Sequence, residues 1–180
     1  YIVDNNSPDN SYQKLKHFFK DLKVVKSKHN NGYAAGHKIA VNFGLENKFD
    51  FIWVLNNDLT VRKETLQKLL LAYDSYGLGI YGSITLKSEN PPVVNFGGGN
   101  TDDITKAFDY NAYEDYPLKD YYENTKLRKV QSVEGSSMLI PIQVIKKHGF
   151  MREDFFMYGE ETDYCYSLKK LGIPSYIIPK

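Results

Sequence analysis

The stretch Phe51-Ile52-Trp53-Val54-Leu55-Asn56-Asn57-Asp58 is an unbroken apolar run that stops at three polar residues, the last of which is a carboxylate. The run is too short for a helix and is typical of a buried strand in a parallel sheet. In open α/β sheets, ligands bind at the carboxyl ends of the strands. The pattern therefore makes Asp58 a candidate for chemistry. An equally good interpretation is that Asp58 caps a following helix, as Thr60 also could.

Strands and helices are predicted to alternate around this run. Short apolar runs predict strands over residues 1–3, 23–27, 51–56 and 79–86. Apolar positions at helical spacing predict helices over residues 12–22, 37–45 and 61–73. This alternation predicts an α/β sheet with parallel strands.

The pattern changes after Lys87. Residues 88–128 contain Pro91-Pro92, three consecutive glycines and a Tyr- and Asp-rich stretch, and they predict an irregular segment without a strong helix. Such long segments in a compact domain are usually functional or mobile. The remaining elements are predicted as a strand at 130–140, a helix between Pro141 and Gly149, a helix at 160–171 and a strand at 173–178.

The composition is that of one soluble domain. The chain has 180 residues, of which 42% are hydrophobic and 25% charged, and its formal net charge of +1 gives no sign of a nucleic-acid partner. The single cysteine, Cys165, excludes an internal disulfide framework, fits a reducing compartment and is expected to be a packed thiol. No stretch reaches the roughly 18 apolar residues that span a membrane, and no signal peptide is present, so we expect a cytoplasmic protein.

Two common kinds of site lack their sequence signals. The loop Asn30-Asn31-Gly32-Tyr33-Ala34-Ala35-Gly36 matches neither the dinucleotide-binding pattern G-x-G-x-x-G nor the P-loop. The four histidines are scattered without the spacing of a zinc site.

Acidic residues stand at the ends of several predicted elements. Asp4 follows the first strand, Asp58 follows the central one, and Glu160-Glu161-Thr162-Asp163 opens the last helix. Mg²⁺ and Mn²⁺ take oxygen ligands and leave room for substrate phosphates, so Asn56 and Asp58 could hold such a cation. Glu160 and Glu161 could simply offset the helix dipole. Alternatively, the apolar residues 155–159 desolvate them, which would raise their pKa and make one of them a better base.

Taken in order, stretches along nearly the whole chain resemble the motifs of glycosyltransferase family 2 enzymes of GT-A fold, particularly bacterial rhamnosyltransferase-like members. The matching stretches are Val3-Asp4-Asn5-Asn6-Ser7-Pro8-Asp9 (V-D-N-x-S-x-D), Asn30-Asn31-Gly32-Tyr33-Ala34-Ala35-Gly36 (N-x-G-[FY]-x-x-G), Val54-Leu55-Asn56-Asn57-Asp58 (L-N-x-D), Gly135-Ser136-Ser137-Met138-Leu139-Ile140 (G-A-x-M-L-I) and Glu153-Asp154-Phe155-Phe156-Met157-Tyr158-Gly159-Glu160-Glu161-Thr162-Asp163 (E-x-F-F-x-Y-x-E-D-x-D). The resemblance implies a Rossmann-like mixed sheet flanked by helices. It also implies one domain over 1–180, with a nucleotide-sugar-binding half at 1–87 and an acceptor-side half at 88–180.

The resemblance also assigns roles to residues of this sequence. Asp4 would contact the base of the nucleotide sugar, and Asp58 would hold Mn²⁺ or Mg²⁺ on the diphosphate. The other residues placed around the nucleotide are Asn6, Asn31, Gly32, Gly36, Lys38, Asn56 and Asn57. Glu161 stands where the family has the Asp of its E-D pair, the general base, with Glu160 and Asp163 beside it as support or as alternative bases.

The activity implied is a metal-dependent, inverting transfer of a sugar from a UDP- or dTDP-sugar to a glycan or lipid-linked acceptor in surface polysaccharide synthesis. The family's first strand has no counterpart here, so we expect a fragment of a longer protein that works at the inner face of the membrane. The rest of that protein could provide peripheral membrane association. Two alternatives are a sugar-1-phosphate nucleotidyltransferase, whose Gly-rich start is absent, and a degenerate domain that binds a nucleotide or glycan without catalysis. The sequence predicts no oligomeric state.

Overall fold

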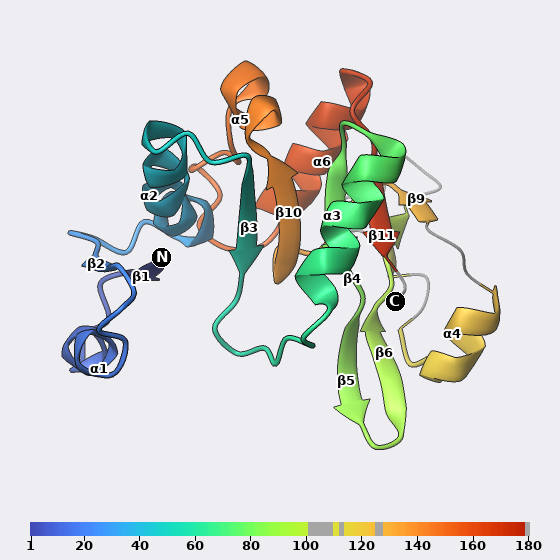
Figure 1. Ribbon diagram of the computed structural model, residues 1–180, viewed down its shortest axis with the longest axis horizontal. Helices are drawn as coiled ribbons and strands as arrows, with labels where there is room; N and C mark the ends of the chain where they lie inside the picture. The colour runs from blue at the N-terminus through green and yellow to red at the C-terminus, as the bar shows by residue number, and fades with distance from the viewer. Residues whose placement is uncertain (101–109, 112–113, 125–127, 179–180) are drawn as a thin grey trace.

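The computed structural model describes residues 1–100, 110–111, 114–124 and 128–178, and it is a mixed α/β protein (Figure 1). In chain order its elements are β1 (Ile2–Asp4), α1 (Ser11–Phe18), β2 (Val24–Lys26), α2 (Tyr33–Glu46), β3 (Phe51–Leu55), α3 (Thr65–Tyr76), β4 (Ile80–Ser83), β5 (Thr85–Glu89), β6 (Pro92–Phe96), β7 (Gly99–Asn100), β8 (Tyr110–Asn111), α4 (Leu118–Asn124), β9 (Arg128–Val130), β10 (Ser137–Pro141), α5 (Ile142–His148), α6 (Glu160–Lys170) and β11 (Ser175–Ile178).

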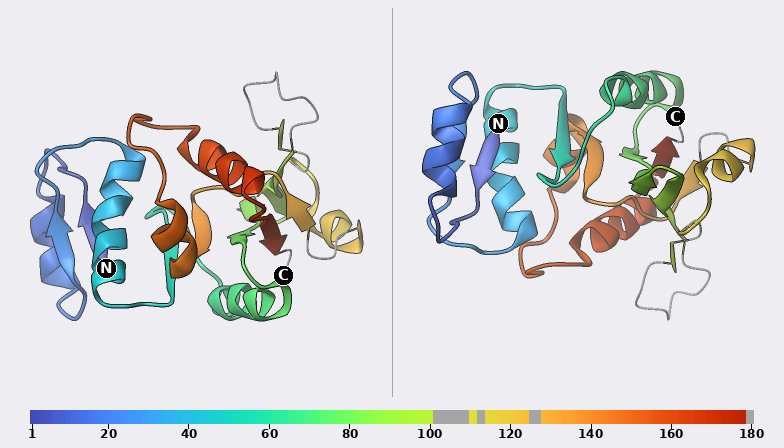
Figure 2. Two further views of the ribbon diagram at one scale, coloured as in Figure 1. Left: turned by 90° about the horizontal axis from the view of Figure 1, so that it is seen from above. Right: turned by 90° about the horizontal axis from the view of Figure 1, so that it is seen from below.

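The amino-terminal part is a small three-layer unit. Strands β1 and β2 pair in parallel, with Ile2 opposite Val24 and Asp4 opposite Lys26. Figure 2 shows α1 at the outer edge of the molecule, with these strands between it and α2. The carboxyl ends of β1 and β2 therefore carry Asp4 and the loops that follow.

The main sheet has five strands in the order β3-β10-β4-β11-β9. It is mixed, as the family resemblance implies, because β11 is parallel to β4 whereas the other pairs are antiparallel. The expectation of a parallel neighbour for the central strand is wrong: β3 pairs antiparallel with β10, with Leu55 opposite Ser137. An apolar run covered on both faces by helices fits either strand direction. Within the described residues β1 pairs only with β2, and β3 only with β10. The β1–β2 pair is thus separate from the main sheet.

Helices cover both faces of the main sheet (Figures 1 and 2). Alternate residues of β3 divide between two cores, as strand geometry requires. Val54 packs with residues of α2, α5 and α6 on one face, and Trp53 packs with residues of α3 on the other. Cys165 is fully buried in the first core, as expected for a packed thiol.

Two predicted helix starts differ from the structure. Helix α3 begins at Thr65 rather than at residue 61, and its N-cap is Glu64, so Thr60 is not a cap. Residues 58–64 instead belong to the loop that leads from β3 to α3 (Figure 1). Helix α2 begins at Tyr33, inside the predicted loop, because Gly32 takes the positive φ of 91° that lets the chain turn into the helix.

The segment predicted to be irregular contains regular structure. Strands β5 and β6 form an antiparallel hairpin, and α4 follows it. Part of its Tyr- and Asp-rich stretch, in residues 101–109 and 112–113, lies outside the described residues. Each of two predicted strands is also divided, at 79–86 into β4 and β5 and at 130–140 into β9 and β10. The predicted strand at 130–140 runs through the mostly polar residues 131–136, where the structure has a loop. A short polar interruption between two strands looks like part of one longer strand in the sequence.

Candidate active site

The first turn of α2 joins the loops that carry the predicted motifs. The amide of Tyr33 donates to Phe156 O at 2.9 Å, and its hydroxyl donates to Gly135 O at 2.6 Å. A Cβ on Gly32 would lie 2.1 Å from Phe156 O, so only glycine permits this contact. The aromatic loop before α6 is therefore held against the loop before α2.

A second set of contacts joins the loop after β1. Asn5 Nδ2 donates to Asn30 Oδ1 and to Gly32 O, both at 3.0 Å. Its side chain also lies over Gly36, where an added Cβ would come within 3.1 Å of it. Gly32 and Gly36 of the predicted motif thus allow the neighbouring loops to pack closely against it.

Asp4 is buried, and only one of its two carboxylate oxygens accepts a hydrogen bond from a described residue. Its side chain is 4% exposed, and Oδ1 accepts a 2.9 Å hydrogen bond from the amide of Ser7. The other oxygen, Oδ2, is buried and has no hydrogen-bond partner among the described residues. A buried, unpaired carboxylate oxygen is costly unless a ligand supplies a donor.

Three carboxylates, those of Glu134, Glu160 and Glu161, lie near Tyr33. Glu160 is 2% exposed, and one oxygen of Glu160 and one of Glu161 are buried without a hydrogen-bond partner among the described residues. Burial, and then the charges of Glu160 and Glu134, raise the pKa of the Glu161 carboxyl. Burial and the charges of Glu161, Glu160 and Glu134 also raise the pKa of the Tyr33 hydroxyl, which therefore remains a proton donor to Gly135 O.

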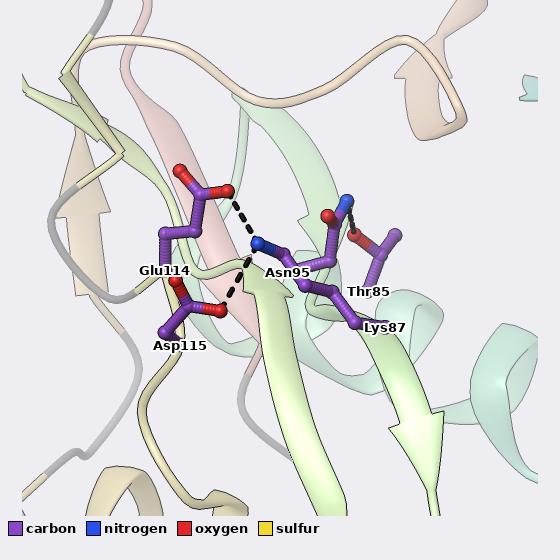
Figure 3. Close-up of polar contacts among 5 residues, drawn as sticks. All are labelled: Thr85, Lys87, Asn95, Glu114 and Asp115. Atoms are coloured by element: carbon purple, nitrogen blue, oxygen red, sulfur yellow. Dashed lines mark hydrogen bonds and ion pairs between the residues drawn. The ribbon is translucent and has the colours of Figure 1, made fainter.

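Glu134 links this cluster to the hairpin. One of its oxygens, Oε2, accepts from Thr85 Oγ1 at 3.0 Å and from Ser136 Oγ at 2.7 Å. Thr85 in turn accepts from Asn95 Nδ2 across the hairpin at 3.2 Å (Figure 3). Beside them, Lys87 contacts Glu114 at 2.5 Å and Asp115 at 3.0 Å, which ties the hairpin to the segment before α4 (Figure 3).

Asp58 lies on a cavity of about 560 Å³ between the loop after β3, the start of α3 and strands β4 and β5. Hydroxyl-bearing residues of its lining are Thr60, Thr65, Ser83, Thr85, Ser88 and Ser137. Its charged lining residues are Asp58, Arg62, Glu64, Lys68 and Lys87. Because Thr85 lines this cavity and also binds Glu134, the cavity and the carboxylate cluster are neighbours. The amide of Asn56 donates to Ser136 O at 3.1 Å, which fixes the end of β3 beside the same segment.

The structure brings only some of the predicted site residues together. Asp4, Gly32 and Gly36 are buried where the loops meet, whereas Asn6, Asn31 and Asn57 are exposed. Lys38 is half exposed and forms an ion pair with Glu153. Asp163 begins α6 with Glu160 and Glu161, but its charge acts on Arg152, whose pKa it helps to raise.

Sequence reasoning missed Glu134, Thr85 and the role of Tyr33. Glu134 precedes the motif starting at Gly135 by one residue, and no spacing rule joins it to Glu161. Tyr33 stands inside the quoted N-x-G-[FY] motif, so its aromatic position was visible, but its contact with Gly135, 102 residues away in sequence, was not.

The oxygen donors at Asp58 fit a hard divalent cation that substrate phosphates also coordinate. No group of three or more His, Cys, Asp or Glu side chains in the described part of the chain could form a complete protein metal centre. A cation at Asp58, with Asn56 nearby, would therefore depend on oxygens of a bound substrate.

Comparison with known families decides the identity of this arrangement. The model of glycosyl transferase family 2 matches residues 1–145. The chain belongs to glycosyl transferase family 2. The family's match covers every motif quoted above up to the start of α5, and therefore includes Asp4, Asp58 and Glu134.

Relatives of this family-2 chain agree with the fold. The low-salt glycan biosynthesis hexosyltransferase Agl10 of Haloferax volcanii is 28% identical over 173 residues, covering 96% of this chain and 53% of Agl10. The chain thus spans about half the length of this curated relative. A crystal structure of GalNAc-T7 with UDP, GalNAc and Mn²⁺ superposes with a TM-score of 0.73 at 14% identity, covering 98% of this chain and 35% of that one. S. aureus TarS 1-349 in complex with UDP gives a TM-score of 0.60 at 13% identity, covering 99% and 47%. These structures establish the GT-A fold.

Proposed function

We propose that this family-2 chain transfers a hexose from a UDP- or dTDP-sugar to a hydroxyl of a glycan or lipid-linked acceptor, with inversion at the anomeric carbon. The observation that carries the proposal is the position of the unpaired polar atoms. Among the described residues, five buried side-chain oxygen or nitrogen atoms lack a partner, and four of them belong to Asp4, Asn5, Glu160 and Glu161. Native proteins leave few such atoms, so their concentration at one site indicates that a ligand satisfies them.

Asp4 would select the base. Uracil and thymine present a ring N–H donor, and Asp4 Oδ2 is a buried acceptor without a partner among the described residues. Neutral cytosine lacks that ring N–H, so the same acceptor would favour uridine or thymidine nucleotides over cytidine nucleotides. The relatives solved with UDP support this choice by analogy of fold.

Glu161 would act as the general base. It would take the proton from the acceptor hydroxyl while that oxygen attacks the anomeric carbon, and the bond from this carbon to the diphosphate oxygen would break. The nucleoside diphosphate would leave with the bonding electron pair. The raised pKa of Glu161 suits the role, because a base with a pKa nearer to neutrality accepts the proton more readily.

Asp58, with Asn56 beside it, would hold Mn²⁺ or Mg²⁺ against the diphosphate of the donor. Such a cation supplies Lewis-acid stabilisation of the negative charge on a leaving diphosphate. The structure of GalNAc-T7 with UDP and Mn²⁺ supports this assignment by analogy.

The cavity beside Asp58 would receive the acceptor. Its hydroxyl-bearing and charged lining suits a polyhydroxylated ligand, because sugars need many donors and acceptors. Its volume of about 560 Å³ lies within the range of small-molecule sites.

Calorimetric titration with UDP, dTDP, GDP and CDP, each with and without Mn²⁺, tests the donor assignment. We expect UDP or dTDP to bind best, with an Mn²⁺-dependent affinity that Asp58→Ala lowers at least about tenfold. Asp74→Ala is the matched control, because Asp74 lies in α3 outside the cavity lining. Equal affinities for all four nucleotides, or Mn²⁺-independent binding that Asp58→Ala leaves unchanged, would contradict the proposal.

A further inference from the structure

Helix α1 and the linker after it expose an unusual amount of apolar surface. Phe18 is 74% exposed, Phe19 44% and Leu22 48%, and α1 buries none of its residues. The apolar spacing predicts a longer helix over residues 12–22 that includes all three of these residues. Instead α1 ends at Phe18, and the three side chains lie around its carboxyl end.

The same region is strongly basic, although the whole chain has a net charge of only +1. Residues 12–28 contain one acidic residue, Asp21, and six lysines, which are Lys14, Lys16, Lys20, Lys23, Lys26 and Lys28. All six lysines are exposed, and none takes part in an ion pair between described residues. Lys26 Nζ donates to Ser7 O at the carboxyl ends of β1 and β2, so the positive charge near the exposed apolar side chains comes from Lys14, Lys16, Lys20 and Lys23.

We propose that this α1 surface, made of Phe18, Phe19, Leu22 and the neighbouring Lys14, Lys16, Lys20 and Lys23, docks on an anionic lipid bilayer. Aromatic and aliphatic side chains next to lysines are the composition of segments that lie in the membrane interface. The apolar groups enter the boundary between headgroups and acyl chains, while each lysine stem reaches to a phosphate. Among the helices of the described residues, none could span a lipid bilayer.

Charge also argues against the other occupants of this surface. A second copy of the chain would bring two sets of lysines together, and like charges repel. A nucleic acid would satisfy the lysines but would leave the exposed Leu22 without a favourable contact. An anionic bilayer complements both the charge and the apolar side chains.

The position of the α1 surface leaves the site accessible. The amide of Ile2 donates to Lys23 O, so the linker after α1 lies at the amino ends of β1 and β2. Asp4 lies at the carboxyl end of β1. In Figure 2, α1 forms the outer edge of the molecule. A bilayer on this edge would not cover the loops that hold the site, and the proposal does not depend on the proposed donor or acceptor.

Flotation with lipid vesicles tests this proposal on the 180-residue chain. We expect binding to vesicles of equal parts phosphatidylglycerol and phosphatidylcholine and at least about tenfold weaker binding to pure phosphatidylcholine. Phe18→Ser with Phe19→Ser should weaken binding to the anionic vesicles about tenfold or more, as should Lys16→Glu with Lys20→Glu. Two matched pairs are the controls: Leu71→Ser with Leu171→Ser removes exposed leucines elsewhere, and Lys146→Glu with Lys147→Glu changes the same charge on α5.

The control pairs should bind as the unchanged chain does. The proposal is overturned if the chain does not float with anionic vesicles, or if the α1 variants and the control variants lose binding equally. Salt-sensitive binding to duplex DNA without vesicle binding would assign the surface to nucleic acid instead. A dimer that the Phe18 and Phe19 changes dissociate, again without vesicle binding, would assign it to a second copy.

Discussion

The hydroxyl of Thr85 donates a 3.0 Å hydrogen bond to Glu134 Oε2 and at the same time lines the cavity on which Asp58 lies. Glu134 raises the pKa of Glu161 through its charge. The two halves of the site, one at the end of β3 and the other at the start of α6, are therefore connected through a residue that belongs to neither motif. This relationship leads to predictions that the sequence motifs alone would not give.

Glu134→Gln should move the pH dependence of transfer. The amide oxygen can still accept from Thr85 and Ser136, but the negative charge that helps to raise the pKa of Glu161 is lost. Glu161 is an active base only when it is deprotonated, so the acidic limb of the kcat/KM profile should shift to lower pH. Glu46→Gln, on the exposed end of α2, is the control. A profile that moves equally in both variants, or in neither, would remove Glu134 from the site.

Glu161→Gln should stabilise the folded chain at neutral and alkaline pH. A carboxyl whose pKa is raised in the folded state contributes stability below its unfolded pKa, and that contribution is lost as the pH rises through the raised value. Glutamine carries no charge, so the variant avoids this loss. Thermal unfolding followed from about pH 4 to pH 8 should give a Tm difference that grows with pH in favour of the variant. A variant less stable than the unchanged chain at pH 8 would contradict the electrostatic account of the cluster.

Gly32→Ala should destabilise the protein through a clash as well as through its backbone angle. Gly32 has φ 91°, and its Cβ would lie 2.1 Å from Phe156 O. Gly77→Ala is a close control, because Gly77 has φ 76° but no atom within 4 Å of the added Cβ. Each change should cost about 1–2 kcal/mol for the left-handed backbone, and only Gly32→Ala should cost substantially more in chemical denaturation. Equal losses would mean that the two loops move apart without penalty.

Much of the fold follows from local patterns. The apolar run at 51–55 becomes β3, Pro141 and Gly149 bound α5, and Gly172 follows the last turn of α6, as the sequence predicts. These elements are fixed by a few neighbouring residues, through proline and glycine geometry and continuous apolar runs.

Other features depend on contacts between distant residues and could not be read from the sequence. The antiparallel pairing of β3 with β10 is one, since an apolar strand does not encode the direction of its partner. The exposure of Phe18 and Leu22 is another, since helical spacing predicts a face but not what covers it. The sequence motifs pointed to Asp4, Asp58 and Glu161, whereas Glu134 emerges only when strand β10 brings residues 134–136 beside Asn56.

The most direct test of the account is the release of nucleoside diphosphate from UDP- and dTDP-hexoses in the presence of Mn²⁺. The unchanged chain should release it, Glu161→Gln should release it about 10²–10⁴ times more slowly while still binding the nucleotide, and Asp163→Asn should stay near the unchanged rate. The account is contradicted if the unchanged chain releases no nucleoside diphosphate from any UDP- or dTDP-hexose. It is also contradicted if Glu161→Gln releases the nucleoside diphosphate as fast as the unchanged chain does.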